Sequence, residues 1–435
     1  MIQSFDTVFA PSSAIGGAIS VIRVSGSASR AIAQKLLDKP VWETPARMRH
    51  TRIRKNGDVI DDCMAVFFAK PKSYTGEDML ELHCHGGMTT VRLVLSALSE
   101  AGGVPAGPGE FTRRAYLSGK MDLSEAEAVM DVINAQAESS LRSALSQLSG
   151  SVSRRVRAVE EALLNVRAAI EAAIDYPDEA EEAAYATLPA VLCEAKETVT
   201  ALIEEGRRAR VLRDGLKLVI LGRPNVGKSS LLNALLGEDR AIVTAAAGTT
   251  RDVLDERLSI GGVPVRLIDT AGLRDASDEA ERIGVDRAKR ALETADVVLL
   301  VLDGSEDMTP EDEALLRETA GKTRIVIANK CDLGTRIQNA LPISCKTGDG
   351  IGNLRERIAA IAAPALQSTE AITNERHLNA LEQARDAITH AEEQTEPDCI
   401  ATDLNEALHR LGSITGTDVD AEVIDRIFAH FCVGK

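Results

Sequence analysis

Apolar and polar residues alternate in short runs over the first part of the chain. The runs at 18–24 and 63–68 are rich in β-branched or aromatic residues and predict strands. Residues 90–101 carry apolar side chains three and four positions apart, which predicts a helix. We therefore expect a small α+β domain over residues 1–118.

The pattern becomes helical from residue 119 onwards. Residues 119–212 are rich in Ala, Glu, Leu and Arg and poor in Gly and Pro, as in a helical bundle. One long helix is expected to start at Leu123, and further helices at 152–174 and 188–210, with a break at 175–178. Helical patterns return at 377–392 and 402–411. Residues 371–435 are therefore expected to be the second part of this helical domain.

Between these two helical parts, strand-like runs alternate with helices. The runs lie at 217–221, 263–268, 297–302, 324–328 and 341–343. Such alternation predicts a mainly parallel sheet with helices on both faces. We expect residues 213–370 to form an α/β domain inserted into the helical one.

Composition and charge narrow the possible functions. Aromatic residues make up only 3% of the chain, so its cores must consist of Ala, Leu, Ile and Val. A net charge of -16 argues against broad binding to nucleic acid or anionic membrane, although a local basic patch could still contact RNA. No apolar run approaches the roughly 18 residues that span a bilayer. The start lacks the pattern of a signal peptide, and the 7 scattered Cys favour a reducing cytoplasm.

The strongest motif is Gly222–Ser229, which fits G-x-x-x-x-G-K-[ST] between a predicted strand and a predicted helix at 230–236. Backbone N–H groups of such a loop and the helix N-terminus attract phosphate oxygens. Lys228 is expected to reach the β- and γ-phosphates, and Ser229 to ligate Mg²⁺. A chance glycine-rich turn would lack this flanking strand and helix. The loop residues expected to contact GTP are Asn225, Val226, Gly227, Lys228, Ser229 and Ser230.

Two segments further along fit the switches of a nucleotide-dependent enzyme. Asp269 fits the carboxylate that supports Mg²⁺ beyond its direct ligands, and the Gly272 N–H can contact the γ-phosphate. Thr250 is expected to coordinate Mg²⁺ and sense the γ-phosphate. Its position between the phosphate-loop helix and the Asp269 strand favours a switch over a polar hairpin. The motif that contains Asp269 consists of Asp269, Thr270, Ala271 and Gly272.

Two loops are expected to select the base. Asn329-Lys330-Cys331-Asp332 resembles the N-K-x-D guanine reader of Ras-like GTPases. Asp332 would accept hydrogen bonds from guanine N1–H and the exocyclic amine, while Asn329 and Lys330 brace the loop. Ser344, Cys345 and Lys346 would close the base pocket, with Cys345 a small departure from the usual Ala. The four ordered motifs predict a Ras-like domain that binds GTP, rather than ATP, with Mg²⁺ and hydrolyses it.

The usual group that orients water for GTP hydrolysis is missing, because Leu273 occupies the position where Ras-like enzymes carry a Gln. The amide oxygen of Asn225 can ligate a monovalent cation, as in the potassium-activated, dimerisation-dependent GTPases of the TrmE-Era-EngA-like class. That resemblance assigns Thr244, Ala246 and Thr249 as further K⁺ ligands. Asn225 could instead only brace its loop. Glu281 is the candidate for orienting water, or else a solvated helix charge.

The whole chain resembles the MnmE (TrmE) family of tRNA-modification GTPases. Beside the nucleotide motifs, six segments carry the resemblance. They are the N-terminal Asp6-Thr7-Val8, the runs at 17–26, 74–78, 80–87 and 107–115, and the tail Phe431-Cys432-Val433-Gly434-Lys435. The tail has Val where the family has Ile. Potassium-type GTPases of other families share the middle segment but lack these flanks.

The resemblance implies a function and partners. Members act with the MnmG flavoprotein, as a heterotetramer, to add a carboxymethylaminomethyl or aminomethyl group at the 5-position of the wobble uridine of certain tRNAs. A 5-formyl- or methylene-tetrahydrofolate supplies the carbon and binds an N-terminal domain that also forms a homodimer. The implied folate contacts are Arg23, Glu81, Lys120 and Lys435. Without the resemblance, each of these would be read as an exposed charge.

Two cysteine-containing patterns have more than one interpretation. Cys432 could attack a one-carbon carrier as a thiolate, or could be a small buried apolar residue. His83 and His85 share one face of a strand, but the sequence shows no further ligands at metal spacing, so a packed strand is preferred to a zinc site.

For the chain as a whole, the competing functions are a GTP-dependent assembly or ribosome-biogenesis switch and a membrane remodeller. The latter would need a basic or amphipathic membrane segment that the sequence lacks.

Overall fold

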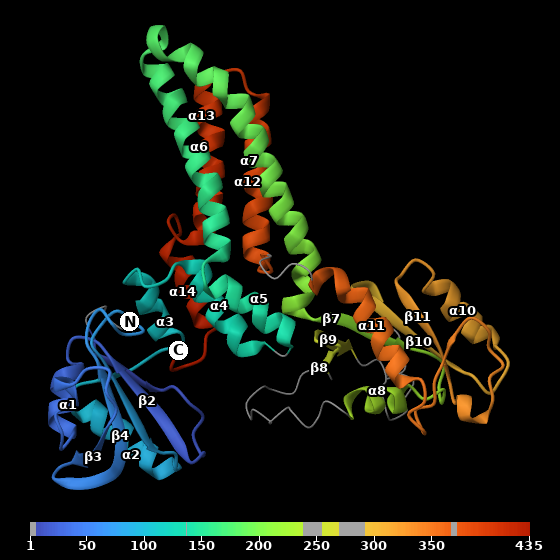
Figure 1. Ribbon diagram of the computed structural model, residues 1–435, viewed down its shortest axis with the longest axis horizontal. Coiled ribbons are helices and arrows are strands. Elements are labelled where there is room, and N and C mark those ends of the chain that lie inside the picture. Colours follow the sequence, from blue (N-terminus) through green and yellow to red (C-terminus); the bar gives the residue numbers. More distant parts are fainter. Residues whose placement is uncertain (1–5, 136, 238–254, 269–291, 367–371) are drawn as a thin grey trace, which may run out of the picture. The chain divides into compact units, whose positions relative to one another are not determined.

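The computed structural model describes residues 6–135, 137–237, 255–268, 292–366 and 372–435. Contacts divide the chain into two units, which we describe separately (Figure 1). The first unit comprises Met1–Met130, Ser153–Glu160 and Leu408–Lys435. The second comprises Asp131–Val152 and Glu161–Ala407. The mixed α+β, helical and P-loop fold class expected from the sequence is confirmed.

The first unit is built on a six-stranded sheet with the order β3-β4-β5-β2-β1-β6. Its neighbours pair antiparallel, except that β6 pairs parallel with β1. The predicted strands at 18–24 and 63–68 are confirmed as β2 and as the second half of a longer β4. The strands are β1 (Val8–Pro11), β2 (Ile19–Ser25), β3 (Arg49–Lys55), β4 (Asp58–Phe68), β5 (Met79–His85) and β6 (Val104–Pro105).

Side chains of this sheet alternate between a buried and a more open face. On β5, Leu82 and Cys84 are buried, whereas His83 is half-buried and His85 is exposed. The two histidines therefore share a face, as the sequence predicts. The buried face packs with apolar residues of two helices, α1 (Ser29–Leu36) and α2 (Met88–Glu100). Helix α2 is the helix predicted at 90–101, and a short 3₁₀ turn, η1, covers Val41–Glu43.

The last residues of the chain belong to the same unit as the N-terminal sheet. Helix α3 (Glu110–Leu117) contacts α14 (Ala421–Ala429), and Phe428 and Phe431 bury their rings together with Leu123. The tail then forms an isolated bridge between Val433 and Pro108. Gly434 has φ 94°, and a Cβ there would lie 2.0 Å from the Pro11 carbonyl oxygen. Only glycine fits this approach, because a side chain would overlap the backbone.

The helical part differs from the sequence prediction at two points. A helix does begin at Leu123, but the prediction that it is long is wrong. Helix α4 ends at Asn134, and Ala137 has an extended backbone before α5 begins. No Gly or Pro lies at this break, so no local signal marks it. The break expected at 175–178 is confirmed, but α7 begins at once at Pro177, because proline lacks an N–H that the first turn does not need. The helices are α4 (Leu123–Asn134), α5 (Glu138–Leu148), α6 (Ser151–Asp175) and α7 (Pro177–Asp214).

Helices from before and after the inserted domain lie side by side in the second unit. Helix α12 (Glu375–Glu393) runs along α7, where Lys196 pairs with Glu392 at 2.5 Å (Figure 1). Helix α13 (Pro397–Thr415) is joined to α6 by a hydrogen bond from Arg167 to Asn405. The insertion predicted from the returning helical pattern is thus confirmed.

The inserted domain is a second six-stranded sheet with the order β12-β11-β10-β7-β9-β8. All neighbours pair parallel except β8, which forms an antiparallel hairpin with β9 and was not predicted. The five predicted strands are confirmed with shifts of one residue or less at their ends. The strands are β7 (Leu216–Leu221), β8 (Asp255–Ile260), β9 (Val263–Ile268), β10 (Val297–Asp303), β11 (Arg324–Asn329) and β12 (Leu341–Pro342).

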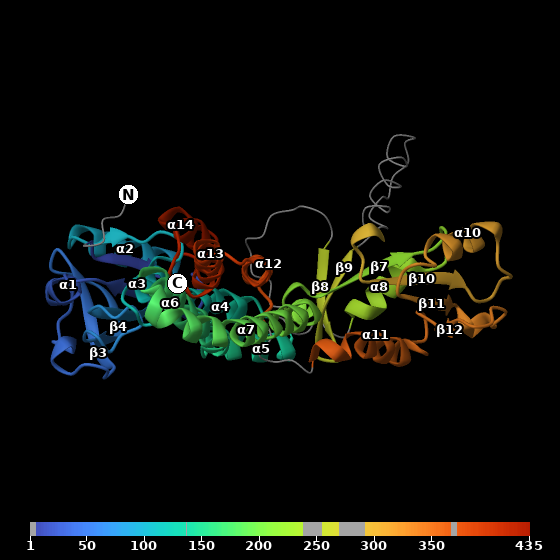
Figure 2. The same ribbon diagram turned by 90° about the horizontal axis from the view of Figure 1, so that it is seen from above.

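Helices cover both faces of this parallel sheet (Figure 2). Apolar residues of α8 (Lys228–Leu236) and α11 (Ile351–Leu366) share one core with it. Leu315 and Leu316 of α10 (Pro310–Glu318) pack against the other face. Strand β10 is buried along its whole length, as expected for a central strand of a doubly covered sheet. Throughout the described residues, no helix combines the length and apolar character needed to cross a membrane.

Candidate nucleotide-binding site

Three of the predicted nucleotide motifs meet at one edge of the parallel sheet. The loop Gly222–Ser229 follows β7, Asn329-Lys330-Cys331-Asp332 follows or ends β11, and Ser344-Cys345-Lys346 comes shortly after β12. These strands are parallel, so their carboxyl ends lie on the same side of the sheet. Ligands of open α/β sheets bind at this edge. Parallel pairing therefore brings together motifs that are about a hundred residues apart in the sequence.

The phosphate loop has a backbone that places its donors at a helix N-terminus. Gly227 has φ 99° and is the N-cap of α8, which begins at Lys228. The Lys228 ammonium donates to the carbonyl oxygens of Gly222 and Arg223, both at 2.8 Å. The positive end of α8 and the Lys228 charge thus lie in one loop, which is the arrangement that attracts phosphate.

Asn329 is the residue that joins the loops to one another. Its Nδ2 donates to the Val226 carbonyl at 2.8 Å, and its Oδ1 accepts from the Cys345 backbone N–H at 3.1 Å. Asn329 is buried, with only 2% of its surface exposed. A Cβ on Gly227 would lie 2.2 Å from Nδ2, so the phosphate loop approaches this amide as closely as glycine permits. The expected bracing role of Asn329 therefore has a specific set of contacts.

The loop expected to read guanine is fixed by contacts with Ser344 and Asp303. The Ser344 hydroxyl donates to Asp332 Oδ1 at 2.7 Å, while Asp332 itself is exposed. Lys330 adopts φ 65° and its ammonium lies 2.6 Å from Asp303 Oδ2. Burial raises the pKa of the Cys345 thiol to about 11, so this thiol stays protonated at neutral pH. Cys345 thus behaves as the small neutral residue that the usual Ala would be.

The donor set fits a magnesium-bound nucleoside triphosphate. The Ser229 hydroxyl is the kind of oxygen ligand that Mg²⁺ accepts beside phosphates. Ser229 and Ser230 are exposed on the first turn of α8, and Lys346 is exposed beyond the closing loop. Asn225 is also exposed and has φ 66°. Because Asn tolerates this left-handed conformation, the backbone alone gives one reason for Asn here, and the loop-bracing interpretation stays open beside the cation one.

Several predicted site residues lie outside the described residues. They include both switch segments and the candidate for orienting water. These residues are Thr244, Ala246, Thr249, Thr250, Asp269, Thr270, Ala271, Gly272 and Glu281. Their assignments stay predictions.

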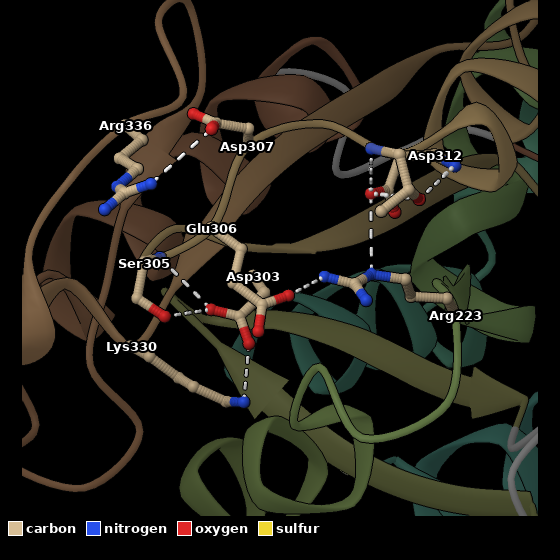
Figure 3. Close-up of polar contacts among 9 residues, drawn as sticks. Arg223, Asp303, Ser305, Glu306, Asp307, Asp312, Lys330 and Arg336 are labelled. Carbon is tan, nitrogen blue, oxygen red and sulfur yellow. Dashed lines mark hydrogen bonds and ion pairs between the residues drawn. The ribbon is translucent and has the colours of Figure 1, made fainter.

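An acidic segment at the same edge belongs to none of the predicted motifs (Figure 3). Asp303 ends β10 and contacts Lys330, and Glu306 and Asp312 both pair with Arg223 of the phosphate loop. One signal could have identified Asp303: it directly follows the wholly apolar run predicted as a strand at 297–302, and such a run is typical of a strand buried on both faces. Arg223 occupies one of the variable positions of the motif, so the motif itself carries no information about it.

The residues that the family resemblance links to folate are only partly brought together. In the first unit, Arg23 and Glu81 are cross-strand partners whose side chains lie 2.8 Å apart, and Arg23 also lies over the Tyr74 ring. The Lys120 ammonium donates to the Pro71 carbonyl at 3.3 Å, and the Lys435 carbonyl accepts from Phe111 N–H. Within the described residues, no hydrogen bond or ion pair joins either lysine to Arg23 or Glu81.

Two further sequence interpretations concern cysteine and metal. Cys432 is exposed, so the interpretation of this residue as a buried apolar side chain is wrong. The reason is that Phe431 turns inward to the Phe428 ring while the next residue faces outward. In the part of the chain that is described, no group of three or more His, Cys, Asp or Glu is arranged to hold a metal ion.

Comparisons with known proteins cover nearly the whole chain. The family descriptions "GTP-binding protein TrmE N-terminus" and "MnmE helical domain" match residues 7–120 and 123–432. A Chloroflexus aurantiacus protein named tRNA modification GTPase MnmE is 43% identical over 99% of this chain and 100% of its own length. A Ligilactobacillus salivarius protein of the same name is 40% identical over 99% of this chain and 98% of its own length.

Among solved structures, a variant of Aquifex aeolicus Era bound to GDP·AlF₄⁻ is 29% identical over 41% of this chain and 67% of that one. Its TM-score of 0.26 is too low to support a structural argument. The full-length similarities do not depend on that comparison. The matches to both family descriptions, and to relatives along 98–100% of their length, establish that this chain belongs to the MnmE family.

Proposed function

We propose that this chain is a GTP hydrolase that acts in tRNA modification. The observation that carries the proposal is the full-length similarity to proteins named tRNA modification GTPase MnmE, 43% and 40% identical. The convergence of the phosphate loop and the guanine-reading loop at one sheet edge supports it independently. The substrate is GTP with Mg²⁺, and the macromolecular partner is tRNA.

In this proposal each described site residue has a physical task. Lys228 and the first turn of α8 bind the phosphates, and Ser229 holds Mg²⁺, which supplies charge neutralisation when bound. Asp332 accepts hydrogen bonds from guanine, and its contact with Ser344 orients the carboxylate for them. Thr250, Asp269 and Gly272 would complete the γ-phosphate side, with Thr244, Ala246 and Thr249 beside them.

Potassium is proposed to replace the arginine that many GTPases use. Asn225 is the described residue of that set, and its exposed amide on the phosphate loop leaves the oxygen accessible to a cation. Exchange of Na⁺ for K⁺ is expected to raise GTP turnover strongly, and Asn225→Ala to remove the difference. Asn225→Asp, which keeps an oxygen ligand, serves as the comparison. Equal turnover of the wild type in both salts would exclude the cation role.

We further propose that the first unit binds a tetrahydrofolate, forms a homodimer and works with the MnmG flavoprotein on the wobble uridine. Support comes from Arg23, Glu81 and the tail residue Lys435 all lying in one unit. Isothermal titration with 5-formyltetrahydrofolate tests this and also separates it from a GTP-dependent assembly switch, for which no saturable binding is expected. Arg23→Gln should weaken binding, whereas Arg52→Gln, on the edge hairpin of the same sheet, should not.

The exposed thiol of Cys432 is proposed as the nucleophile of the one-carbon step. Cys432→Ser is expected to leave GTP hydrolysis intact and to abolish tRNA modification. The control is Cys399→Ser, because Cys399 is also exposed but belongs to the second unit, whereas Cys432 belongs to the first. Modification that survives in Cys432→Ser would remove the nucleophile assignment.

The decisive experiment is mass spectrometry of tRNA wobble bases from cells that lack this protein. Loss of the modified uridine is expected, with recovery when the wild-type chain is supplied. Lys228→Ala should fail to restore the modification, because the phosphate loop loses its cation. Lys322→Ala, a lysine of the same domain outside the nucleotide motifs, should restore it. Unchanged wobble bases in the deleted strain would refute the proposed function.

A further inference from the structure

An acidic segment between β10 and α10 connects the two halves of the nucleotide site. We define the acidic bridge as Asp303, Glu306 and Asp312. Strand β10 lies between β7 and β11 in the sheet, so the segment that leaves its carboxyl end passes between the phosphate loop and the guanine-reading loop. Figure 3 shows Arg223 and Lys330 reaching this segment from the two loops.

The contact on the guanine side is short and buried. Asp303 is 6% exposed and accepts hydrogen bonds from Lys330 at 2.6 Å and from the Ser305 hydroxyl at 2.6 Å. Burial by itself would raise the pKa of Asp303, but the hydrogen bonds from Lys330 and Ser305 outweigh it and lower the pKa below 3.8. Asp303 is therefore ionised at neutral pH and holds the Lys330 side chain by a charge-assisted bond.

The contact on the phosphate side uses both remaining members of the bridge. Arg223 Nη2 donates to Glu306 Oε2 at 2.5 Å, and Arg223 Nε lies 3.4 Å from Asp312 Oδ2. Glu306 is largely solvent-exposed, whereas the Asp312 side chain is 2% exposed. Asp312 is fixed in turn, because it forms the capping box of α10 with Thr309. Arg223 is thus tied to a rigid helix N-terminus.

The backbone of Arg223 connects this anchor to the phosphate-binding lysine. Lys228 donates to the carbonyl oxygens of Gly222 and Arg223, both at 2.8 Å, so these two carbonyls set the direction of its ammonium. The Arg223 side chain gives this segment an ionic anchor outside the loop, through Glu306 and Asp312. Loss of the anchor would let the carbonyls rotate, and the Lys228 charge would then lose its fixed position.

We propose that Arg223 is a positioning residue of the GTP site, which holds the phosphate loop against the acidic bridge through Glu306 and Asp312. The inference rests on the proposed GTP binding. Arg223 acts through the loop backbone and through Lys228, so its loss lowers affinity for GTP and GDP alike. Such a uniform loss of binding raises KM and leaves kcat unchanged.

The matched pair Arg223→Gln and Arg336→Gln in the full-length protein tests this. Arg336 pairs with Asp307 of the same segment at 3.5 Å, and both are exposed. Each substitution removes one positive charge from one ion-pair system, but only Arg223 lies on the phosphate loop. Arg223→Gln is expected to raise the Kd of fluorescent GDP and the KM for GTP by about tenfold, the effect of losing one charge-assisted contact. Arg336→Gln should leave both unchanged.

A purely structural role predicts a different pattern. It would lower the melting temperature of the nucleotide-free protein without a specific rise in KM, and that result would overturn the proposal. Equal Kd values for Arg223→Gln and the wild type, or an equal loss in Arg336→Gln, would also overturn it. Arg223→Lys, which keeps the charge, should recover part of the affinity. Wild-type protein that fails to bind GTP would instead refute the proposed function itself.

A second pair keeps the test open if Arg223→Gln does not fold. Glu306→Gln removes the exposed acceptor and Asp307→Asn removes the neighbouring carboxylate that pairs with Arg336. Both sites are at the surface, so neither change threatens the core. Glu306→Gln is expected to raise the KM less than Arg223→Gln would, because solvent screens this pair, and Asp307→Asn to leave the KM unchanged. Identical KM values for the two variants would overturn the proposal.

Discussion

Replacement of Asn329 by alanine tests how the three loops of the nucleotide site depend on one amide. The substitution removes the hydrogen bond from Nδ2 to the Val226 carbonyl at 2.8 Å and the bond from Cys345 N–H to Oδ1 at 3.1 Å. Alanine can replace neither. The phosphate loop would then lose its hydrogen bond to β11, and the loop that closes the base pocket would keep the Ser344–Asp332 hydrogen bond but lose the one from Cys345 N–H.

The structure sets the size of the expected effect. A buried donor or acceptor left without a partner costs about 1–3 kcal/mol. Val226 is 1% exposed, so its carbonyl loses its partner without gaining water, whereas Cys345 is half-buried and its N–H has better access. We therefore expect a total near 2–3 kcal/mol, which is about a 30- to 140-fold loss of GTP affinity if the aligned loops are what GTP binds.

Equilibrium titration with a fluorescent GDP analogue in the presence of Mg²⁺ measures this loss. The matched control is Gln338→Ala, an exposed amide in the same domain. Circular dichroism of the same samples checks that the domain remains folded. A folded Asn329→Ala protein with wild-type affinity would refute the reasoning, because the loops would then be aligned without the amide. A loss of similar size in Gln338→Ala would refute it too.

Three other outcomes are expected. Asp332→Asn should shift preference from GTP toward xanthosine triphosphate in competition titrations, and unchanged selectivity would contradict the guanine-reading role. Gly227→Ala should abolish GTP binding, because its Cβ would lie 2.2 Å from Asn329 Nδ2, whereas Gly262→Ala has similar backbone strain at φ 79° with open space around it and should retain binding. The hydrogen bond to Asp61 raises the pKa of His85 above 6.5, so its stabilising contribution is full below about pH 6.5 and is lost as the pH rises through the folded pKa. Nuclear magnetic resonance titration should show this raised pKa in the wild type and a lower one in Asp61→Asn; equal values would contradict the assignment.

The sequence alone determined the elements whose signals are local. The five parallel strands of the inserted domain were predictable because each is a short apolar run between polar turns, and the phosphate loop because its chemistry demands glycines and lysine at set spacing. The break after Asn134 was not predictable, since neither Gly nor Pro marks it. Strand β8 was missed because its run, Asp255–Ile260, is mostly polar and depends on the β9 hairpin for its partner.

Only the tertiary structure decided which side chains complete the nucleotide site. Asp303, Glu306 and Asp312 are ordinary acidic residues in sequence, and Arg223 occupies a variable motif position. They meet because the order β7-β10-β11 puts the segment after β10 between two loops that it does not adjoin in the chain. Motifs encode the groups that touch a ligand, since those groups need fixed spacing. The contacts that hold such groups in place depend on strand order, which no local pattern records.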